Sequence, residues 1–266
     1  MRLQIEHETL YRFSEAVPYS IQGLRLTPRD HIGQRVLVWR MDGSMMPGMK
    51  PVEDPFGNLT HTVTIDHPHT GIHVRVMGMV ETEDTAGIIR GTQERFPLLF
   101  YRRTTPQTMP NAALRELAYS ARTDRGEIAR LHDLMQRIRD RIDYQTGVTH
   151  AQTTAAEALA RGAGVCQDHA HVFLCCARIL GIPARYVSGY LCTDEEADAV
   201  ASHAWAEAYV ADLGWIGFDV ANRVCPTAAY VRMAVGLDYR QAAPFRGIRR
   251  GRAGEMLSVR VRVARA

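Results

Sequence analysis

Short apolar runs separated by turn-forming residues occupy the chain up to about residue 95. Two runs, at 61–66 and 71–82, alternate apolar and polar residues, and two more, at 2–13 and 35–42, are apolar and aromatic. Alternation with a period of two is typical of strands with one buried face, and proline- and glycine-rich segments between such runs are typical of turns. The pattern predicts an antiparallel β-sandwich-like domain over residues 1–95.

Helical spacing replaces this alternation from about residue 111. Apolar positions at 128–142 trace one helical stripe, a short helical segment at 153–164 ends in glycines, and Cys166 begins a third segment that stops near Gly181. Strand-like runs then return at 184–191, 203–210, 215–220 and 257–265. This order predicts helices packed on an antiparallel sheet over residues 96–266, and therefore an α+β protein with a β-rich N-terminal domain.

Composition narrows the range of partners. The 266 residues are 46% hydrophobic and 23% charged, as in ordinary globular proteins, and the formal net charge is only +3. Arginines are concentrated between Arg246 and Arg265, where they partly alternate with apolar residues. We interpret this segment as the solvated face of a strand and a loop, and we expect no nucleic-acid partner.

The chain shows no obvious targeting or membrane segment. No run approaches the roughly eighteen apolar residues of a membrane helix, and the first residues lack the apolar stretch of a signal peptide. The five cysteines form an odd and unevenly spaced set, which fits reduced thiols better than a disulfide framework. We therefore expect a cytoplasmic protein with no membrane partner. Its oligomeric state stays open.

The stretch GVCQDHAH, residues 164–171, raises three interpretations of Cys166. At the start of a helix, unpaired backbone N–H groups and the helix dipole favour a thiolate, so Cys166 can be a nucleophile. It can equally be a buried thiol, because free cysteine is among the most buried residue types. A metal site with His169 and His171 is disfavoured, because Cys-x-x-His-x-His on one helix directs its side chains apart and no second Cys/His pair has the usual spacing.

Two later residues favour the nucleophile. A thiol nucleophile needs a base, and the base needs a third group to fix its orientation. His203 begins the strand HAWAEAYV and Asp219 ends the strand WIGFDV, with the turn ADLG between them. Antiparallel pairing brings the start of one strand beside the end of the other. We therefore expect His203 and Asp219 to be neighbours at one edge of the sheet, with the helix of Cys166 packed against it.

Three motifs around these residues resemble the core of the transglutaminase-like superfamily: GVCQDHAH, SHAWAEAYV and GWIGFDVANR. The first half of the chain resembles the β-rich N-terminal region of a bacterial branch, through LRLTPRD and VEDPFGN. Many members have Asp-Pro-Thr at the third motif, whereas here Val220 and Ala221 follow Asp219. The resemblance implies a papain-like core in which Cys166 is the nucleophile, His203 the base and acid, and Asp219 the residue that orients the histidine.

The resemblance leaves the reaction open, since the superfamily includes transglutaminases, peptidases, amidases and inactive relatives. We expect a cysteine hydrolase of peptide or amide bonds that forms a thioester and needs no cofactor or metal. A protein-glutamine transamidase and a non-catalytic peptide-binding module are the alternatives. A missing triad residue would favour the binding module, and none is missing.

Four further residues are candidates for contact with the substrate. The Cys166 backbone N–H can supply one donor to an oxyanion, and Tyr144 or Gln145 is a candidate for the second. Gln167 can line the cleft or face solvent. Trp205, on the same strand face as His203, can form a wall of the cleft or pack in the core.

Overall fold

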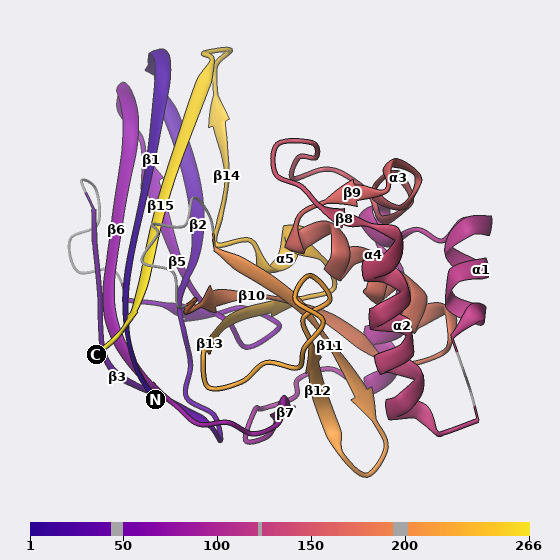
Figure 1. Ribbon diagram of the computed structural model, residues 1–266. Helices are drawn as coiled ribbons and strands as arrows, with labels where there is room; N and C mark the ends of the chain where they lie inside the picture. The colour runs from indigo at the N-terminus through magenta and orange to yellow at the C-terminus, as the bar shows by residue number, and fades with distance from the viewer. Residues whose placement is uncertain (44–49, 122–123, 194–201) are drawn as a thin grey trace.

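Two four-stranded antiparallel sheets make up one side of the molecule (Figure 1). The fold is given by a computed structural model that describes residues 1–43, 50–121, 124–193 and 202–266. The first sheet has the order β15 (Glu255–Arg265), β1 (Arg2–Val17), β6 (His69–Thr82) and β3 (Gln34–Gly43). The second has the order β14 (Phe245–Arg250), β2 (Tyr19–Thr27), β5 (Leu59–Ile65) and β4 (Val52–Glu53).

The alternating residues of these strands bury one face of each sheet. Leu3 and Ile5 of β1 share a hydrophobic core with Leu24 of β2 and Val63 of β5. The four strand-like runs of the sequence correspond to β1, β3, β5 and β6, so those predictions are confirmed. Strand β2 is not among the predicted strands, because only Pro18 separates it from β1 and a proline between apolar runs is typical of a turn.

The end of the chain returns to these first two sheets. Strand β15 pairs with β1 over its whole length, and β14 pairs with β2. Residues 245–265 are therefore a pair of strands rather than one strand and a loop. The sheets join residues from both sides of the predicted division at residue 95, because the two last strands hydrogen-bond to the two first ones.

A third antiparallel sheet lies between these sheets and the helices (Figure 1). Its order is β13 (Tyr230–Gly236), β10 (Ala184–Leu191), β11 (His203–Val210), β12 (Gly214–Phe218) and β7 (Ile88–Ile89). The helices are α1 (Ala112–Ser120), α2 (Glu127–Arg141), α3 (Ala155–Arg161), α4 (Cys166–Ile179) and α5 (Tyr239–Ala242), with 3₁₀ turns at Leu98–Arg102 and Pro106–Thr108. A short parallel pair, β8 (Asp143–Tyr144) and β9 (Ala163–Gly164), precedes α4.

Helix α4 is the central helix of this part. It packs against β10 and β11, and α1, α2 and α3 pack around it. Its apolar residues Val172, Phe173 and Leu174 are fully buried, and Gly181, with φ +80°, follows its end. The helices predicted at 128–142, at 153–164 and from Cys166 are confirmed as α2, α3 and α4. Within the described ranges, none of the helices has the length and apolar character needed to cross a membrane.

Candidate active site

The start of α4 is held in place by the carboxylate of Asp168. This carboxylate accepts hydrogen bonds from the backbone N–H of Val165 at 2.8 Å and from the Thr149 hydroxyl at 2.7 Å. Gly164 allows the close approach, since a Cβ atom there would lie 2.7 Å from the Asp168 Oδ2 atom. The arrangement fixes Cys166 in the first turn of α4, where no residue of the helix can accept from its backbone N–H.

His203 and Asp219 come together as their strands pair. Strands β11 and β12 are antiparallel, with Ala206 opposite Phe218, so the start of β11 lies beside the residues that follow β12. A ring N–H of His203, at Nε2, donates to Asp219 Oδ2 at 2.6 Å. Asp219 is completely buried and His203 is mostly buried. The neighbourhood expected from the two motifs is present.

Two more residues bind the Asp219 carboxylate. The Asn222 side-chain amide donates to Oδ2 at 2.7 Å, and the Tyr230 hydroxyl donates to the same atom at 2.7 Å. A tight turn returns Asn222 to Asp219, because the backbone groups of Asp219 and Val224 hydrogen-bond to each other. Sequence reasoning missed both residues. Asn222 lies inside the motif GWIGFDVANR and could have been noticed there, whereas Tyr230 comes from β13 and has no local signal.

The charges of this group stabilise a protonated histidine. Burial alone lowers the pKa of His203, but hydrogen bonds to Asp219 and Cys166, together with their charges, raise it to about 10. Burial likewise raises the pKa of Asp219, but its hydrogen bond and charge interaction with His203, and the bonds from Tyr230 and Asn222, bring the net pKa below the ordinary value. His203 and Asp219 therefore form a buried ion pair at neutral pH.

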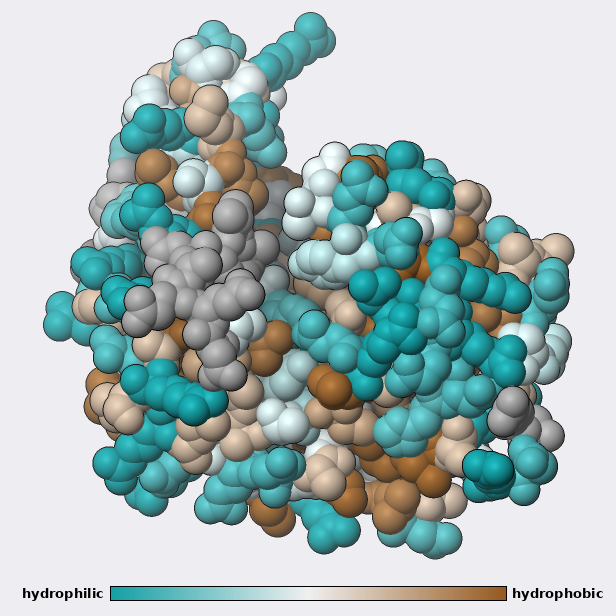
Figure 2. Space-filling view, in the orientation of Figure 1, coloured by the Kyte–Doolittle hydropathy of each residue, from teal (hydrophilic) through white to brown (hydrophobic). Residues whose placement is uncertain are grey.

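Cys166 and His203 open into one cavity of about 640 Å³. The start of α4 and strand β10 form one side of it, with Tyr186, Ser188 and Tyr190. Val261 and Val263 of β15 also line it. In the space-filling view, a notch separates the part that contains the two sheets from the helical part (Figure 2). The cleft thus lies between the third sheet and a strand from the far end of the chain.

The four accessory candidates take different places. Tyr144 and Gln167 line the cavity, and the charges of Cys166 and Asp219 add to burial in raising the pKa of Tyr144. Gln145 is outside the described lining, and its backbone N–H donates to Gly164 O at 2.8 Å. Trp205 is buried behind His203, with ring centroids 6.2 Å apart, so among the described contacts it packs in the core and does not line the cavity.

The two histidines of α4 make structural contacts. The ring nitrogens of His169 lie 2.9 Å from Val165 O and 3.0 Å from Ile142 O. His171 is fully buried, and its Nε2 atom accepts from the backbone N–H of Tyr239 at 3.1 Å. In the part of the chain that the structure describes, no group of three or more His, Cys, Asp or Glu side chains is arranged to hold a metal ion.

Comparison with known proteins shows which family this chain belongs to. The model of the transglutaminase-like superfamily matches residues 115–220, and that of the bacterial transglutaminase-like N-terminal region matches residues 3–81. An uncharacterized protein of Mycobacterium leprae is 30% identical over 99% of this chain and 99% of its own length. The chain belongs to the transglutaminase-like superfamily.

Two further proteins are similar to this chain over most of its length. An uncharacterized protein of Mycobacterium tuberculosis is 28% identical over 93% of this chain and 87% of its own. The solved structure of a candidate cysteine protease from Cytophaga hutchinsonii superposes with a TM-score of 0.79 at 21% identity, over 99% of this chain and 90% of that one, which shows a shared fold. Membership in the superfamily indicates an enzyme of the general cysteine hydrolase or transamidase kind.

Proposed function

We propose that the protein is a cysteine hydrolase of peptide or amide bonds, with Cys166, His203 and Asp219 as its catalytic triad. The observation that carries the proposal is the buried His203–Asp219 pair, 2.6 Å apart, with His203 and Cys166 in the wall of the same cavity. A buried charged pair is costly to maintain, and it places a proton donor beside a thiol at the start of a helix.

The reaction follows from this placement. The Cys166 thiolate attacks the carbonyl carbon, and the carbonyl oxygen becomes an oxyanion close to the Cys166 backbone N–H. The C–N bond then breaks as protonated His203 gives its proton to the leaving amine, which leaves a thioester on Cys166. His203, now neutral, takes a proton from water, and the resulting hydroxide attacks the thioester. The C–S bond breaks, the acid is released, and thiolate and protonated histidine are restored.

Tyr144 is the proposed second donor to the oxyanion. Its side chain lines the cavity with Cys166, and its pKa responds to the charge of Cys166. Gln167, also in the lining, is proposed to contact the substrate. The proposal further includes a sandwich-like arrangement of the first two sheets, a papain-like arrangement of α4 on the third sheet, a cytoplasmic location and a reaction without a cofactor.

Two alternatives share the same cleft. A transamidase would pass the acyl group from the thioester to an amine instead of water. A non-catalytic relative would bind a peptide in the cleft without forming a thioester. We favour hydrolysis because the five free cysteines fit a reducing compartment, which offers less reason for protein cross-linking than an extracellular one.

A peptide-library experiment distinguishes these functions. The protein is incubated with the library with and without a primary amine, and products are identified by mass spectrometry, with Cys166→Ala as the inactive control. We expect hydrolysed peptides from the wild type alone. Products that carry the amine and form faster than hydrolysed ones would establish a transamidase. A Cys166→Ala variant with unchanged products or unchanged cellular phenotype would contradict catalysis by this cysteine.

A further inference from the structure

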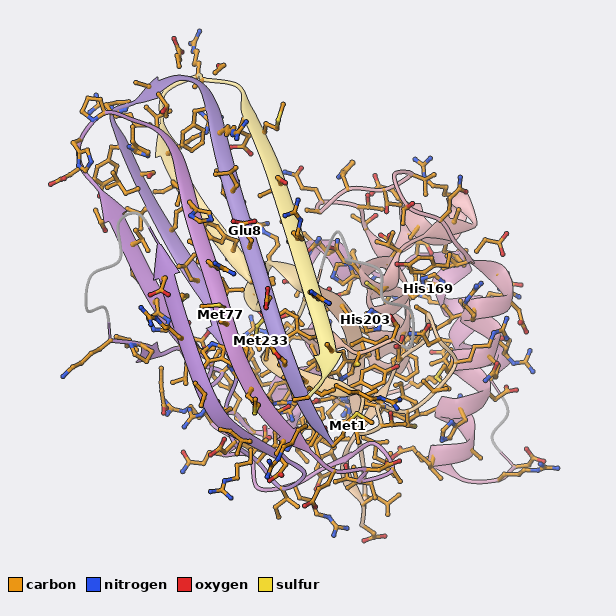
Figure 3. The ribbon with its side chains drawn as sticks, turned by 60° about the vertical axis from the view of Figure 1, so that its left-hand side comes forward. Met1, Glu8, Met77, His169, His203 and Met233 are labelled. Atoms are coloured by element: carbon orange, nitrogen blue, oxygen red, sulfur yellow. The ribbon has the colours of Figure 1, made fainter. Side chains whose placement is uncertain are left out.

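The outer edge of strand β15 has no strand partner in the described ranges of the chain. β15 is the last strand in its sheet, and β1 is its neighbour on the inner side. Figure 3 shows β15 as the outermost strand of this sheet, on the side toward His203. The outer edge of such a strand presents backbone N–H and C=O groups that can pair with another extended chain.

The register identifies which residues present these groups. Ala266 donates its backbone N–H to Arg2 O at 3.0 Å, so the even-numbered residues of β15 bond to β1. The odd-numbered residues then direct their N–H and C=O groups outward. Val263 agrees with this alternation, because its carbonyl oxygen accepts from the Cys192 thiol at 3.7 Å on the side away from β1.

The same odd-numbered residues line the cleft. Val261 and Val263 line the cavity of Cys166. Leu257 and Val259, with Ser258 between them, line a second cavity of about 410 Å³, and Ser202 and Tyr239 line both cavities. The Val263 carbonyl already accepts from Cys192, so the outward backbone groups of Leu257, Val259 and Val261 form the path that runs along the two cavities.

We propose that the substrate is an extended peptide that adds as a strand to the outer edge of β15 and so presents one of its carbonyl groups to Cys166. This proposal rests on the proposed function and specifies its substrate class. Backbone groups that repeat every two residues bind a peptide main chain independently of most side chains. A small amide could not use this edge.

The second cavity gives this strand a side-chain preference. Its walls include the apolar and aromatic side chains of Tyr11, Phe245, Leu257 and Val259. In an added strand, alternate side chains point to the same face, so every second residue of the peptide meets these walls. The peptides that bind best therefore carry apolar residues at alternate positions.

N-methylated peptides test the strand addition directly. The probe is a fluorescein-labelled peptide of eight residues that alternates valine with threonine or glutamate, and its binding is measured by fluorescence anisotropy. Two isomers carry N-methyl groups on either the odd or the even residues. Because only alternate N–H groups of an added strand donate to β15, we expect one isomer to bind at least about ten-fold more weakly than the parent and the other to bind nearly as well. No binding by the parent, or equal binding by all three peptides, would overturn the proposal.

Substitutions at Val259 locate the site. Val259→Pro removes one outward N–H group and leaves the bonds to β1 intact, and Val259→Ala is the matched control that keeps this group. We expect the proline variant to bind the parent peptide about five-fold more weakly than the alanine variant. Equal binding by the two variants would contradict the assignment to β15. A dimer that Val259→Pro disrupts, without any peptide binding, would assign the edge to a second copy of the chain and overturn the proposal.

Alkylation of Cys166 in the presence of the peptide tests whether the β15 edge leads to the candidate nucleophile. It also distinguishes failure of the docking edge from failure of the proposed function. The parent peptide should slow the alkylation of Cys166 by iodoacetamide, since both occupy the same cleft. Suppose that N-methylation weakens binding at only one of the two alternate sets of residues, but Cys166 reacts no faster than an ordinary thiol. The docking edge then stands and the proposed catalysis fails. If Cys166 is activated but the peptide neither binds nor protects it, catalysis stands and the docking edge is wrong.

Discussion

Asp219 binds more donors than the one needed to orient His203. It is fully buried and accepts from His203, Asn222 and Tyr230, all within 2.7 Å of one oxygen. A buried carboxylate is stable only when it is paired and hydrogen-bonded, and these three donors provide for that. The turn that follows Asp219 brings the Asn222 side chain to the carboxylate.

Removing the charge of Asp219 should change the pH dependence of catalysis. His203 must be protonated to release the amine, and its pKa of about 10 places the alkaline loss of activity near that pH. In Asp219→Asn the hydrogen bond and charge that raise the pKa of His203 are lost or weakened. We expect the alkaline limb to move toward neutral pH, measured as kcat/KM against pH with a peptide selected from the library. An unchanged limb would show that His203 is not the titrating group.

His203 also makes the free energy of unfolding depend on pH. The pKa of His203 in the folded protein lies above its ordinary value of 6.5. Its contribution to the free energy of unfolding is therefore complete below about pH 6.5 and is lost as the pH rises toward 10. Chemical denaturation between pH 6 and 10 should show a loss of stability in the wild type that is smaller in His203→Ala. Parallel curves for the two proteins would contradict this.

Tyr230 is expected to act as a positioning residue. Its hydroxyl binds Asp219 and its ring packs against Trp205, with centroids 5.5 Å apart. Tyr230→Phe keeps the packing and removes one bond to a charged group, which should lower kcat about ten-fold with little change in KM. Tyr119→Phe, on the exposed surface, is the control. A fall in thermal stability that accounts for all of the lost activity would indicate a purely structural role.

At the scale of elements, the sequence allowed the start of α4 and the pairing of β11 with β12 to be predicted. Cys166 follows a glycine-rich loop, and His203 and Asp219 mark the ends of two short strands, so local pattern was enough. Tyr230 and the β15 wall of the cleft could not be predicted. They come from strands whose neighbours are distant in sequence, and no local pattern identifies which strands pair.

The strand that carries His203 also carries a buried ion network. Glu207 of β11 is fully buried and binds Arg185 at 2.5 Å and Arg232 at 2.7 Å. Burial raises the pKa of Glu207, but the charges and hydrogen bonds of the two arginines lower it to about 2. The network ties β11 to β10 and β13, and it thereby supports the strand on which His203 lies.

Glu207→Gln should destabilise the protein by roughly 3 kcal/mol, because Arg232 loses its buried carboxylate partner and Arg185 keeps only Glu94. The stabilisation is present above about pH 4.5 and is lost as the pH falls toward 2. Urea denaturation at pH 7 and pH 3 should show a smaller difference between variant and wild type at pH 3. The control is Glu81→Gln, which affects an exposed pair with Arg2 and should cost less than about 1 kcal/mol. Equal effects of the two substitutions would refute the structural role of the network.

At the scale of the whole molecule, the fold class was predictable, but the pairing of the last two strands with the first two was not. Period-two runs and helical stripes identify a β-rich first part and helices that follow it. The return of residues 245–265 to β1 and β2 depends on edge pairing across nearly the whole chain. Arg260, Arg262 and Arg265 of this segment are exposed, as expected of the solvated face of a strand, but that pattern does not say which sheet the strand joins.

Because β14 and β15 complete the first two sheets, residues 1–95 should not fold without them. A fragment of residues 1–95 lacks β14 and β15, so we expect it to show no cooperative unfolding transition by circular dichroism. The two termini lie side by side, since Ala266 bonds to Arg2. A fusion of residues 245–266 through a short linker to residues 1–95 should therefore restore a cooperative unfolding transition. A fragment of residues 1–95 that unfolds cooperatively without the last two strands would contradict the account.

The rate at which iodoacetamide alkylates each cysteine tests the central claim, that Cys166 is a nucleophile activated by His203. All five cysteines are free, and the partly exposed Cys192 and Cys225 serve as internal references. Peptide mapping at neutral pH should show Cys166 alkylated on the order of ten-fold faster than either reference, and His203→Ala should remove this advantage. Equal, slow alkylation of all five cysteines in the native protein, unaffected by His203→Ala, would contradict the claim.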